Sequence, residues 1–420
     1  MLHNIQPEDH PPLGARMASA VSTCVHCGFC LAACPTYQEL GQEADSPRGR
    51  IVLMKEVLEG TLALEAALPH IDPCLGCLAC EPACPSGVPY RDLISPFRAL
   101  TEPKRKRKLA ERLSRTLAQR TLPYPGRLRL AALGARIAKP FAGWLPKSLR
   151  VMLDLLPESL PRKQTWQEIY PAIGRRRARV ALLIGCAQSV LDPDINTATI
   201  DVLTRNGVEV VVPRGQSCCG ALSWHIGNHP QAQAFAQHNL DAFPPDVDAI
   251  VTNAAGCGSA MHEYDLILKG TGDDQRAEAF RSKVCDVSVL LDTLGPLQPI
   301  PATQGKLRVA YHDACHLANA QGVRSQPRKL LRLIPGVELC EIADAHLCCG
   351  SAGTYNIDQP EIASSLGAQK ADHILAIDPV VVATGNIGCI TQLRAHLAKK
   401  GSNVLVRHTM QILRDAYQET

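Results

Sequence analysis

Two groups of four cysteines near the N-terminus have the spacing of iron–sulfur cluster ligands. Each group follows the pattern C-x2-C-x2-C-x3-C-P, first ending at Pro35 and again at Pro85. Three thiolates at intervals of three residues wrap one face of a [4Fe–4S] cubane, and the fourth leads away to the other cluster. The spacing therefore predicts two clusters. Their ligands would be Cys24, Cys27, Cys30 and Cys84 for the first, and Cys74, Cys77, Cys80 and Cys34 for the second.

Zinc sites and disulfide bonds are the other common uses of closely spaced cysteines. Zinc takes four ligands in two pairs and does not need the trailing x3-C-P, which both groups contain. Cysteines separated by two residues point toward a shared centre more easily than toward each other, so disulfides do not account for the pattern. We therefore interpret both groups as iron–sulfur ligands, and we expect a reducing, cytoplasmic compartment.

A second cysteine pattern occurs twice in the C-terminal part of the chain. Each copy has a single cysteine, then Cys-Cys-Gly, then another single cysteine. The three landmarks of the two copies lie 129, 130 and 132 residues apart, which indicates an internal repeat. The residues are Cys186, Cys218, Cys219 and Cys257 in the first copy, and Cys315, Cys348, Cys349 and Cys389 in the second.

Four cysteines per copy are enough for one metal centre each, and the sequence leaves three alternatives open. The first is a third iron–sulfur cluster in at least one copy, and the second is zinc or another structural metal. The third is a set of metal-free thiols beside a partner's flavin or a quinone pocket. Adjacent cysteines do not easily form a disulfide with each other, so a shared metal explains the Cys-Cys-Gly triplets better.

Three polar residues surround the first cysteine of the second copy. His312, Asp313 and His316 flank Cys315 directly after an apolar run. Two interpretations remain open for them. They take part in redox or substrate chemistry, or they position the cysteine loop through hydrogen bonds.

The elements that position these cysteines can be read from the hydrophobic pattern. Apolar runs predict strands at 179–184, 208–212 and 248–252, and again at 307–311, 337–341 and 379–383, with a helix at 194–206. Strands separated by helices imply parallel α/β units, which bind ligands beyond the carboxyl ends of their strands.

The resulting fold class is multidomain α+β with α/β repeats. We expect a helical bacterial-type ferredoxin domain over 1–100, a basic helical linker over 101–177, and tandem cysteine-rich α/β repeats over 178–300 and 301–420. Prolines break the linker into short helices.

Composition and charge exclude several classes of function. The chain has 420 residues, 46% of them hydrophobic, without an apolar run long enough to span a membrane, and its first 16 residues do not resemble a secretory signal. It contains neither a G-x-G-x-x-G fingerprint after a strand nor a P-loop. Residues 101–180 hold 20 Lys or Arg against five Asp or Glu. This charge is local and lacks interleaved aromatic residues, so nucleic-acid binding is not expected.

The order of the motifs resembles that of the iron–sulfur subunits of bacterial glycolate oxidase. The cysteine-rich repeats are similar to those of the heterodisulfide reductase superfamily, although that pattern ends in C-x-x-C and the last cysteine is missing from both copies. Four further strings carry the resemblance. They are D-S-P-R-G-R at 45–50, C-E-P-A-C-P-S-G-V at 80–88, H-D-A-C-H-L at 312–317 and C-C-G-S-A-G-T-Y at 348–355.

The resemblance implies an electron-transfer subunit that is inactive alone. FAD-binding partner subunits would oxidise glycolate to glyoxylate, with D-lactate as a further substrate, and this chain would pass the electrons to a quinone or another acceptor. The implied location is cytoplasmic, with peripheral contact between the basic run at 104–108 and the inner membrane. Alternatives are a related lactate or glycerol-3-phosphate dehydrogenase subunit, or a catalytic subunit similar to heterodisulfide reductase.

Overall fold

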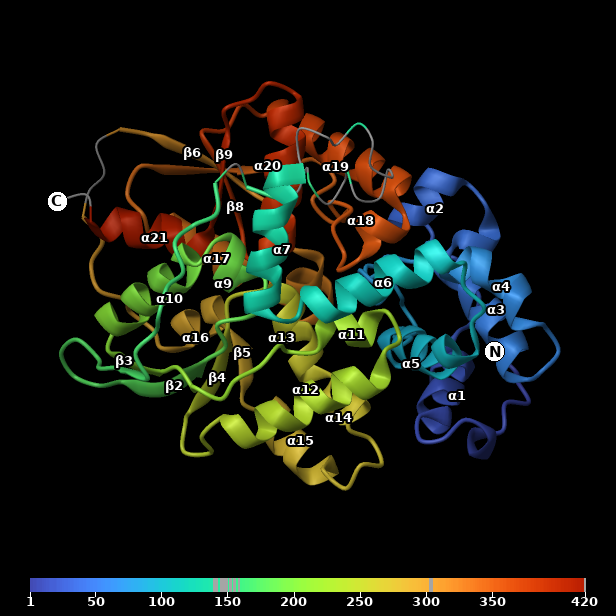
Figure 1. Ribbon diagram of the computed structural model, residues 1–420. Coiled ribbons are helices and arrows are strands. Elements are labelled where there is room, and N and C mark those ends of the chain that lie inside the picture. The colour runs from blue at the N-terminus through green and yellow to red at the C-terminus, as the bar shows by residue number, and fades with distance from the viewer. Residues whose placement is uncertain are drawn as a thin grey trace.

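The computed structural model describes residues 1–138, 143, 150, 153, 156–157, 159–301 and 305–418. Three parts follow one another along the chain: a helical N-terminal region, two linker helices, and an α/β region with two sheets (Figure 1). The expected mixed α+β fold class is confirmed. Much of the expected linker between 139 and 158 lies outside the described residues.

The N-terminal region consists of short helices joined by the cysteine loops. The chain enters α2 through Cys34 at the N-cap and Pro35 at the first helical position, where proline has no amide hydrogen to leave unpaired. Ser46 caps α3 by accepting a 2.9 Å hydrogen bond from the amide of Gly49. The helices are α1 (Gly14–Thr23), α2 (Pro35–Leu40), α3 (Pro47–Leu58), α4 (Leu64–Ile71) and α5 (Arg91–Thr101).

The α/β region contains two sheets with the same strand order. The first sheet runs β1-β3-β2-β4-β5 and the second runs β7-β6-β8-β9. All neighbours pair in parallel except β1, an additional strand that lies antiparallel to β3. The shared order confirms the internal repeat. The strands are β1 (Ile169–Tyr170), β2 (Ala178–Leu182), β3 (Val208–Val211), β4 (Ala249–Thr252), β5 (Val284–Asp286), β6 (Leu307–Tyr311), β7 (Val337–Glu341), β8 (Val381–Thr384) and β9 (Leu405–His408).

Helices cover both sheets and join them into one core. Apolar side chains of both repeats, such as Val180 and Val309, belong to the same buried cluster. The last helix lies against the first repeat, where the amide of Asn206 donates a 3.3 Å hydrogen bond to the hydroxyl of Tyr417. The helices are α9 (Gln188–Leu191), α10 (Asp194–Arg205), α11 (Ala221–His225), α12 (His229–Ala242), α13 (Ala255–His262), α14 (Tyr264–Ile267), α15 (Asp274–Arg281), α16 (Val287–Thr293), α17 (Ser325–Arg332), α18 (Tyr355–Asp358), α19 (Pro360–Leu375), α20 (Ile387–Lys399) and α21 (Thr409–Gln418).

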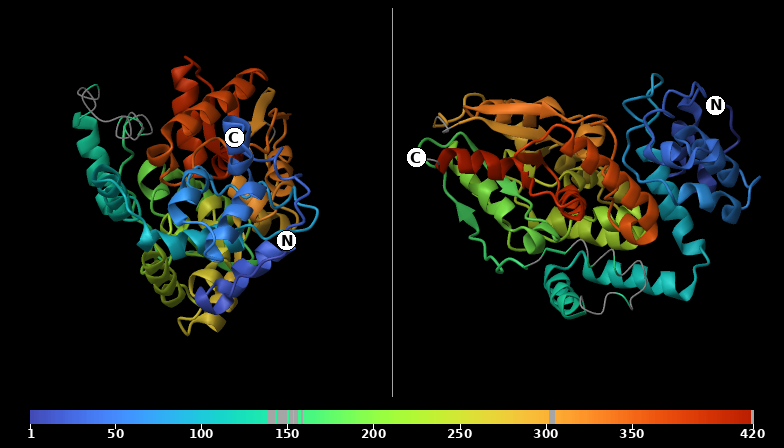
Figure 2. Two further views of the ribbon diagram at one scale, coloured as in Figure 1. Left: turned by 90° about the vertical axis from the view of Figure 1, so that its right-hand side faces the viewer. Right: turned by 90° about the horizontal axis from the view of Figure 1, so that it is seen from above.

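Two linker helices, α6 (Leu109–Thr121) and α7 (Pro125–Ala138), run from the N-terminal region along the α/β region (Figure 2). On the inner face of α6, Arg115 forms a 2.9 Å ion pair with Asp358 and donates a hydrogen bond to the carbonyl of Ile226. This arginine therefore contacts both repeats. Among the described residues, none of the helices has the length and apolar character needed to cross a membrane.

Candidate iron–sulfur and cysteine-rich sites

The N-terminal cysteines gather around two small adjacent pockets. The first three cysteines of each motif face the fourth cysteine of the other, which is the arrangement that the spacing predicts for two interleaved clusters. Cys80 borders both pockets. One pocket is lined by Cys24, Cys27, Cys30 and Cys84, and the other by Cys34, Cys74, Cys77 and Cys80. The cysteines that line each pocket include the four thiols that one cubane needs, and the assignment of each ligand stays a prediction.

Each cysteine loop has two residues in the left-handed region of backbone space. In the first loop His26 has a φ of 60° and Gly28 a φ of 84°, and in the second loop Gly76 and Leu78 have φ values of 66° and 56°. Non-glycine residues rarely adopt this conformation unless the surrounding structure enforces it. In the second loop it lets the amide of Gly76 donate a 3.4 Å hydrogen bond to the sulfur of Cys74.

Two arginines, the buried Arg50 and the half-buried Arg98, support the second group of cysteines. The guanidinium of Arg50 lies 3.8 Å from the sulfur of Cys34, and Arg98 donates a 2.6 Å hydrogen bond to the carbonyl of Cys74. Burial disfavours the Cys74 thiolate, but the positive charges of both arginines, together with hydrogen bonds from Gly76 and Tyr90, outweigh this effect and hold the pKa of Cys74 below its ordinary value. A thiolate is the form that binds metal. Burial raises the pKa of Cys77 and Cys80 instead, so a bound cluster would supply the positive charge that these two thiols need to ionise.

The cysteines of the two repeats lie beyond the carboxyl ends of parallel strands, as expected. Cys186 follows β2, and the Cys-Cys-Gly triplet at 218–220 follows β3. Cys257 lies in the first turn of α13, which follows β4. The second repeat places its cysteines in the same way after β6, β7 and β8.

Within each repeat the sulfurs approach one another closely. The Sγ atoms of Cys186 and Cys218 are 3.6 Å apart, and those of Cys315 and Cys348 are 3.9 Å apart. Contact with Cys218 and burial raise the pKa of Cys186 well above its ordinary value, and contact with Cys348 and burial do the same for Cys315. A bound metal ion would supply the positive charge that such thiols need to ionise. The donor sets therefore fit a metal centre.

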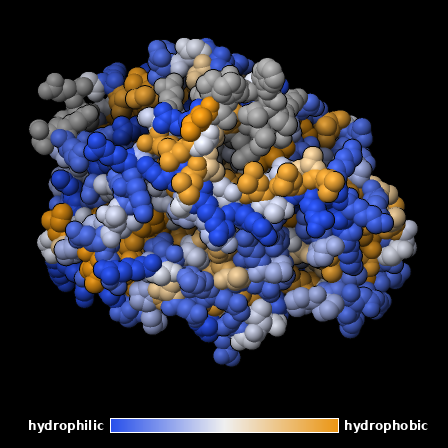
Figure 3. All heavy atoms as spheres, in the orientation of Figure 1, coloured by the Kyte–Doolittle hydropathy of each residue, from blue (hydrophilic) through white to orange (hydrophobic). Residues whose placement is uncertain are grey.

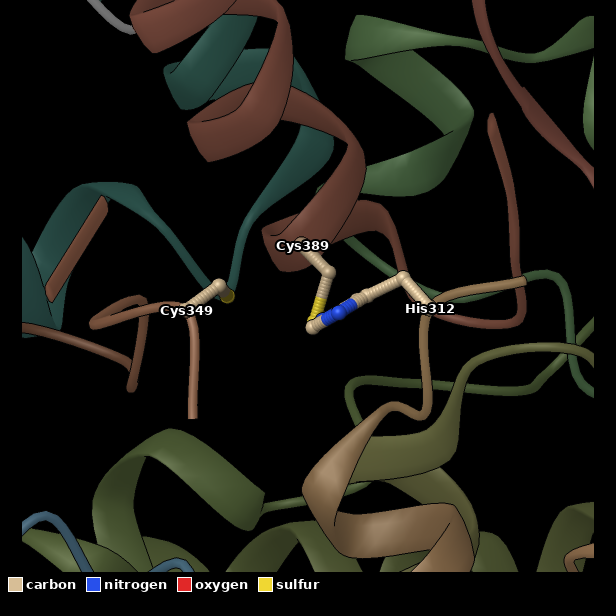
Figure 4. A group of neighbouring side chains, drawn as sticks. All are labelled: His312, Cys349 and Cys389. Carbon is tan, nitrogen blue, oxygen red and sulfur yellow. The ribbon is translucent and has the colours of Figure 1, made fainter. Parts of the chain in front are cut away.

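The three polar residues around Cys315 have different surroundings. Asp313 forms a 2.7 Å ion pair with Arg328 and has a structural role. The imidazole of His316 is hydrogen-bonded to the carbonyl of Gly76 at 3.0 Å, so it joins the second repeat to the N-terminal region. His312 alone of the three faces the cysteines Cys349 and Cys389 (Figure 4).

Sequence reasoning missed the junction between the second cysteine loop and the second repeat. The amide of Asn319 donates a 3.1 Å hydrogen bond to the carbonyl of Cys77, and Arg91 donates one to the carbonyl of Ala320. Cys77 and Cys315 pack against the same apolar cluster, which contains Leu75 and Cys348. The sequence contains one signal for this junction, the strings at 312–317 and 348–355. Their residues His316 and Tyr355 contact the N-terminal region.

The comparisons with known proteins agree with this geometry. Residues 20–88 match the 4Fe-4S dicluster domain family, and residues 180–262 and 309–394 match the cysteine-rich domain family. Fold and cysteine placement together define an iron–sulfur protein of electron-transfer complexes.

The particular family follows from relatives that align over nearly the whole chain. The chain is 38% identical to the glycolate oxidase iron-sulfur subunit of Escherichia coli (strain K12), covering 96% of this chain and 95% of that protein. It is 37% identical to the probable glycolate oxidase iron-sulfur subunit of Bacillus subtilis (strain 168), covering 94% and 93%. The chain belongs to the family of glycolate oxidase iron–sulfur subunits. Lactate utilization protein A of Oceanobacillus iheyensis is 30% identical over 56% of this chain and 96% of its own length.

Proposed function

We propose that this chain transfers electrons in a complex whose FAD-binding subunits oxidise glycolate to glyoxylate. The oxidation releases two electrons and two protons, which a partner's flavin accepts together. The chain then takes the electrons one at a time through its N-terminal clusters and delivers them to a quinone or another acceptor. D-lactate is a further substrate of the same complex, and the chain alone does not oxidise either acid.

The observation that carries this proposal is the contact between the second cysteine loop and the second repeat. Cys77 and Cys315 belong to one buried contact region, held by the hydrogen bonds of His316 and Asn319. Such a rigid contact supports a continuous electron path. A redox-inert metal protein would not need it.

The second candidate is catalysis by the repeats themselves, as in heterodisulfide reductase. In both repeats the position of the last cysteine is taken by another buried residue, Ala260 in the first and Gln392 in the second. The amide of Gln392 donates a 3.1 Å hydrogen bond to the carbonyl of Ala363 and so has a packing role. This substitution favours electron transfer over thiol catalysis.

The acceptor side of the proposal is supported by a cavity and a surface. A cavity of about 300 Å³ opens beside Cys74, with Arg98, His225 and Tyr355 among its lining residues, and it suits a small electron acceptor such as a quinone headgroup. On the surface, α6 and α7 expose a stripe of apolar side chains (Figure 3). The stripe consists of Leu109, Leu113, Leu117, Leu130, Leu133 and Ile137.

Basic residues border this apolar stripe and favour an anionic membrane as its partner. Lys104, Lys106 and Lys108 are exposed, whereas Arg105 and Arg107 of the same basic run form ion pairs with Asp72 and Glu102. Exposed leucines beside exposed lysines are typical of helices that lie in the membrane interface. We therefore place peripheral contact with the inner membrane at α6 and α7.

The test combines the anaerobically purified chain with the FAD-binding subunits of the same organism. Glycolate is added, and bleaching of the iron–sulfur absorbance together with the EPR spectrum reports reduction. We expect reduction with glycolate only when the FAD-binding subunits are present. Reduction by D-lactate or glycerol 3-phosphate, but not by glycolate, would assign the chain to a related dehydrogenase. Disulfide reduction by the chain alone would reject the proposal.

A further inference from the structure

His312 is a buried polar side chain without a partner. It is 1% exposed, and neither ring nitrogen has a hydrogen-bond partner among the described residues. Leaving a buried polar group unpaired costs about 1–3 kcal/mol, so such a group in a folded protein calls for an explanation such as a bound ion. The surroundings of the ring show what could bind there.

The ring faces two cysteines of the second repeat (Figure 4). A ring nitrogen of His312 and the sulfurs of Cys349 and Cys389 all lie within 4.8 Å of one another, and both cysteines are 1% exposed. In the part of the chain that the structure describes, no other three His, Cys, Asp or Glu side chains bring their donor atoms so close together. The group is therefore a candidate for a shared metal ion.

The spacing of the three donor atoms suits a single zinc ion. Bonds of about 2.3 Å to sulfur and about 2.0 Å to nitrogen place the ligands of a tetrahedral zinc roughly 3.5–3.8 Å apart, so small side-chain rotations would bring these atoms onto one ion. A cubane cluster holds its ligands on separate irons and therefore farther apart. Two thiolates and a neutral imidazole also balance the charge of a divalent ion, which a buried site requires.

The first repeat has no histidine at the corresponding position. Leu183 stands three residues before Cys186, as His312 stands three residues before Cys315. Leu183 is 2% exposed and belongs to an apolar core cluster. Both repeats lack the last cysteine of the superfamily pattern, but only the second has a histidine directed at its cysteines. The donor sets of the two repeats are therefore unequal.

The three side chains come from segments that lead to the junction with the N-terminal region. His312 lies four residues before His316, whose imidazole is hydrogen-bonded to the second cysteine loop. Cys349 lies six residues before Tyr355, whose hydroxyl is hydrogen-bonded to the backbone directly before that loop. Cys389 lies in the first turn of α20. One ion bound by all three would therefore anchor both contacting loops to the body of the second repeat.

We propose that His312, Cys349 and Cys389 bind one zinc ion, which holds the second repeat in its contact with the second cysteine loop. The first repeat has no such site. Zinc is redox-inert, so the ion itself takes up no electron. Electrons that leave the second N-terminal cluster would instead reach the cavity beside Cys74, whose wall includes Tyr355 of this repeat. The inference goes beyond the proposed function and does not depend on it.

The experiment uses the full-length chain, purified anaerobically without chelators. Zinc, iron and sulfide are measured in wild type, His312→Leu, His312→Cys and the matched first-repeat variant Leu183→Ala, and X-ray absorption at the zinc edge reports imidazole ligation. Each protein is then incubated with ferrous iron and sulfide. This step refills any cluster site that zinc has entered by chance.

We expect about one zinc and about eight irons in wild type and L183A, since two cubanes hold eight irons. H312L should lose most of its zinc, keep its irons and show faster hydrogen exchange of the backbone amides at 74–78. H312C should keep the zinc without the imidazole signature, which a merely structural histidine would not cause. Iron and sulfide should not displace the zinc from wild type. The EPR signals of the two N-terminal clusters verify that each variant is folded.

Wild type without zinc, zinc that H312L retains, zinc without an imidazole ligand, or uptake of four further irons with loss of zinc would each overturn the inference. In those cases glycolate would still reduce the N-terminal clusters through the FAD-binding subunits if the proposed function is right. The opposite result, a zinc ion bound by imidazole without any reduction by glycolate, would reject the function and keep the zinc site.

Discussion

The hydroxyl of Tyr355 donates a 2.7 Å hydrogen bond to the backbone carbonyl of Pro73, the residue directly before the first cysteine of the second motif. Tyr355 follows the Cys-Cys-Gly triplet of the second repeat by five residues and is 6% exposed. One buried side chain thus connects the loop of the second N-terminal cluster to the cysteine loop of the second repeat. The distance between the two cysteine groups is fixed by this bond and by its neighbours.

Replacing Tyr355 by phenylalanine should loosen this junction without emptying either site. Removal of the hydroxyl leaves the carbonyl of Pro73 unpaired, at a cost of about 1–2 kcal/mol. We expect faster hydrogen exchange of the backbone amides at 74–78 and a smaller magnetic coupling between the second N-terminal cluster and its neighbours. Tyr417→Phe is the matched control, because its hydroxyl donates a 3.1 Å bond to the carbonyl of Gln298 far from the cysteines. If both variants change the EPR spectrum equally, the junction does not set the coupling.

The interleaved ligand assignment predicts a distinctive pattern of double variants. Cys34→Ser should remove the cluster of the second motif and leave about four of the eight irons. Adding Cys77→Ser should remove no further iron, since both side chains would serve the same cluster. Adding Cys27→Ser instead should remove the remaining cluster. The variants are made in the full-length chain, and EPR of the reduced protein counts the ferredoxin-type clusters that remain in each. The reverse pattern would show that each motif binds its own cluster.

Arg50 should raise the potential of the second cluster. Its guanidinium is 1% exposed and lies 3.8 Å from the sulfur of Cys34, so its charge favours the more negative, reduced cluster. Arg50→Met should therefore lower that midpoint potential, by about 59 mV for each 1.4 kcal/mol of lost interaction. Arg48→Met is the matched control, because Arg48 donates its 2.8 Å bond to the carbonyl of His26 in the other loop. Redox titration followed by EPR should show the two variants affecting different clusters.

The sequence predicted most of the fold because its signals are local. The strands at 208–212 and 307–311 were correct within one residue, since buried parallel strands are continuous apolar runs. The edge strands β1, β5 and β9 were missed because β1 has only two residues and the other two do not form a continuous apolar run, β5 ending in Asp286 and β9 in Arg407 and His408. The contacts of His316 and Tyr355 with the N-terminal region were also missed. They join residues more than 200 positions apart, and no local pattern encodes such a pair.

Glu263 should make stability depend on pH. The carboxylate is 2% exposed and accepts a 2.7 Å hydrogen bond from the indole of Trp224. Burial raises the pKa of Glu263 from 4.5 to about 7, despite this hydrogen bond and the charge of Arg91. The folded protein thus binds more protons than the unfolded chain between these values. The free energy of unfolding therefore falls as the pH rises from about 4.5 to 7, by an amount of the order of 3 kcal/mol.

Glu263→Gln removes the titrating group and keeps an acceptor for Trp224. We expect this variant to have a higher Tm than wild type at pH 8 and a similar Tm near pH 4.5, with thermal unfolding followed by circular dichroism. Asp274→Asn is the control, because Asp274 lies on the surface in an ion pair with Lys269. A constant difference between Glu263→Gln and wild type at every pH would contradict a raised pKa.

The apolar stripe on α6 and α7 should bind membranes that carry anionic lipid. Leu113 and Leu117 are 72% and 52% exposed, and burying a leucine contributes about 1.5–3 kcal/mol. Changing both to glutamine should weaken co-sedimentation with phosphatidylglycerol vesicles by at least about a hundredfold. Binding by wild type should weaken with salt, because the exposed lysines contribute electrostatically.

The control changes Leu333 and Leu405, which are 51% and 56% exposed elsewhere on the surface. If vesicle binding is unchanged while the FAD-binding subunits no longer co-purify, the stripe is a subunit interface and the membrane assignment is wrong.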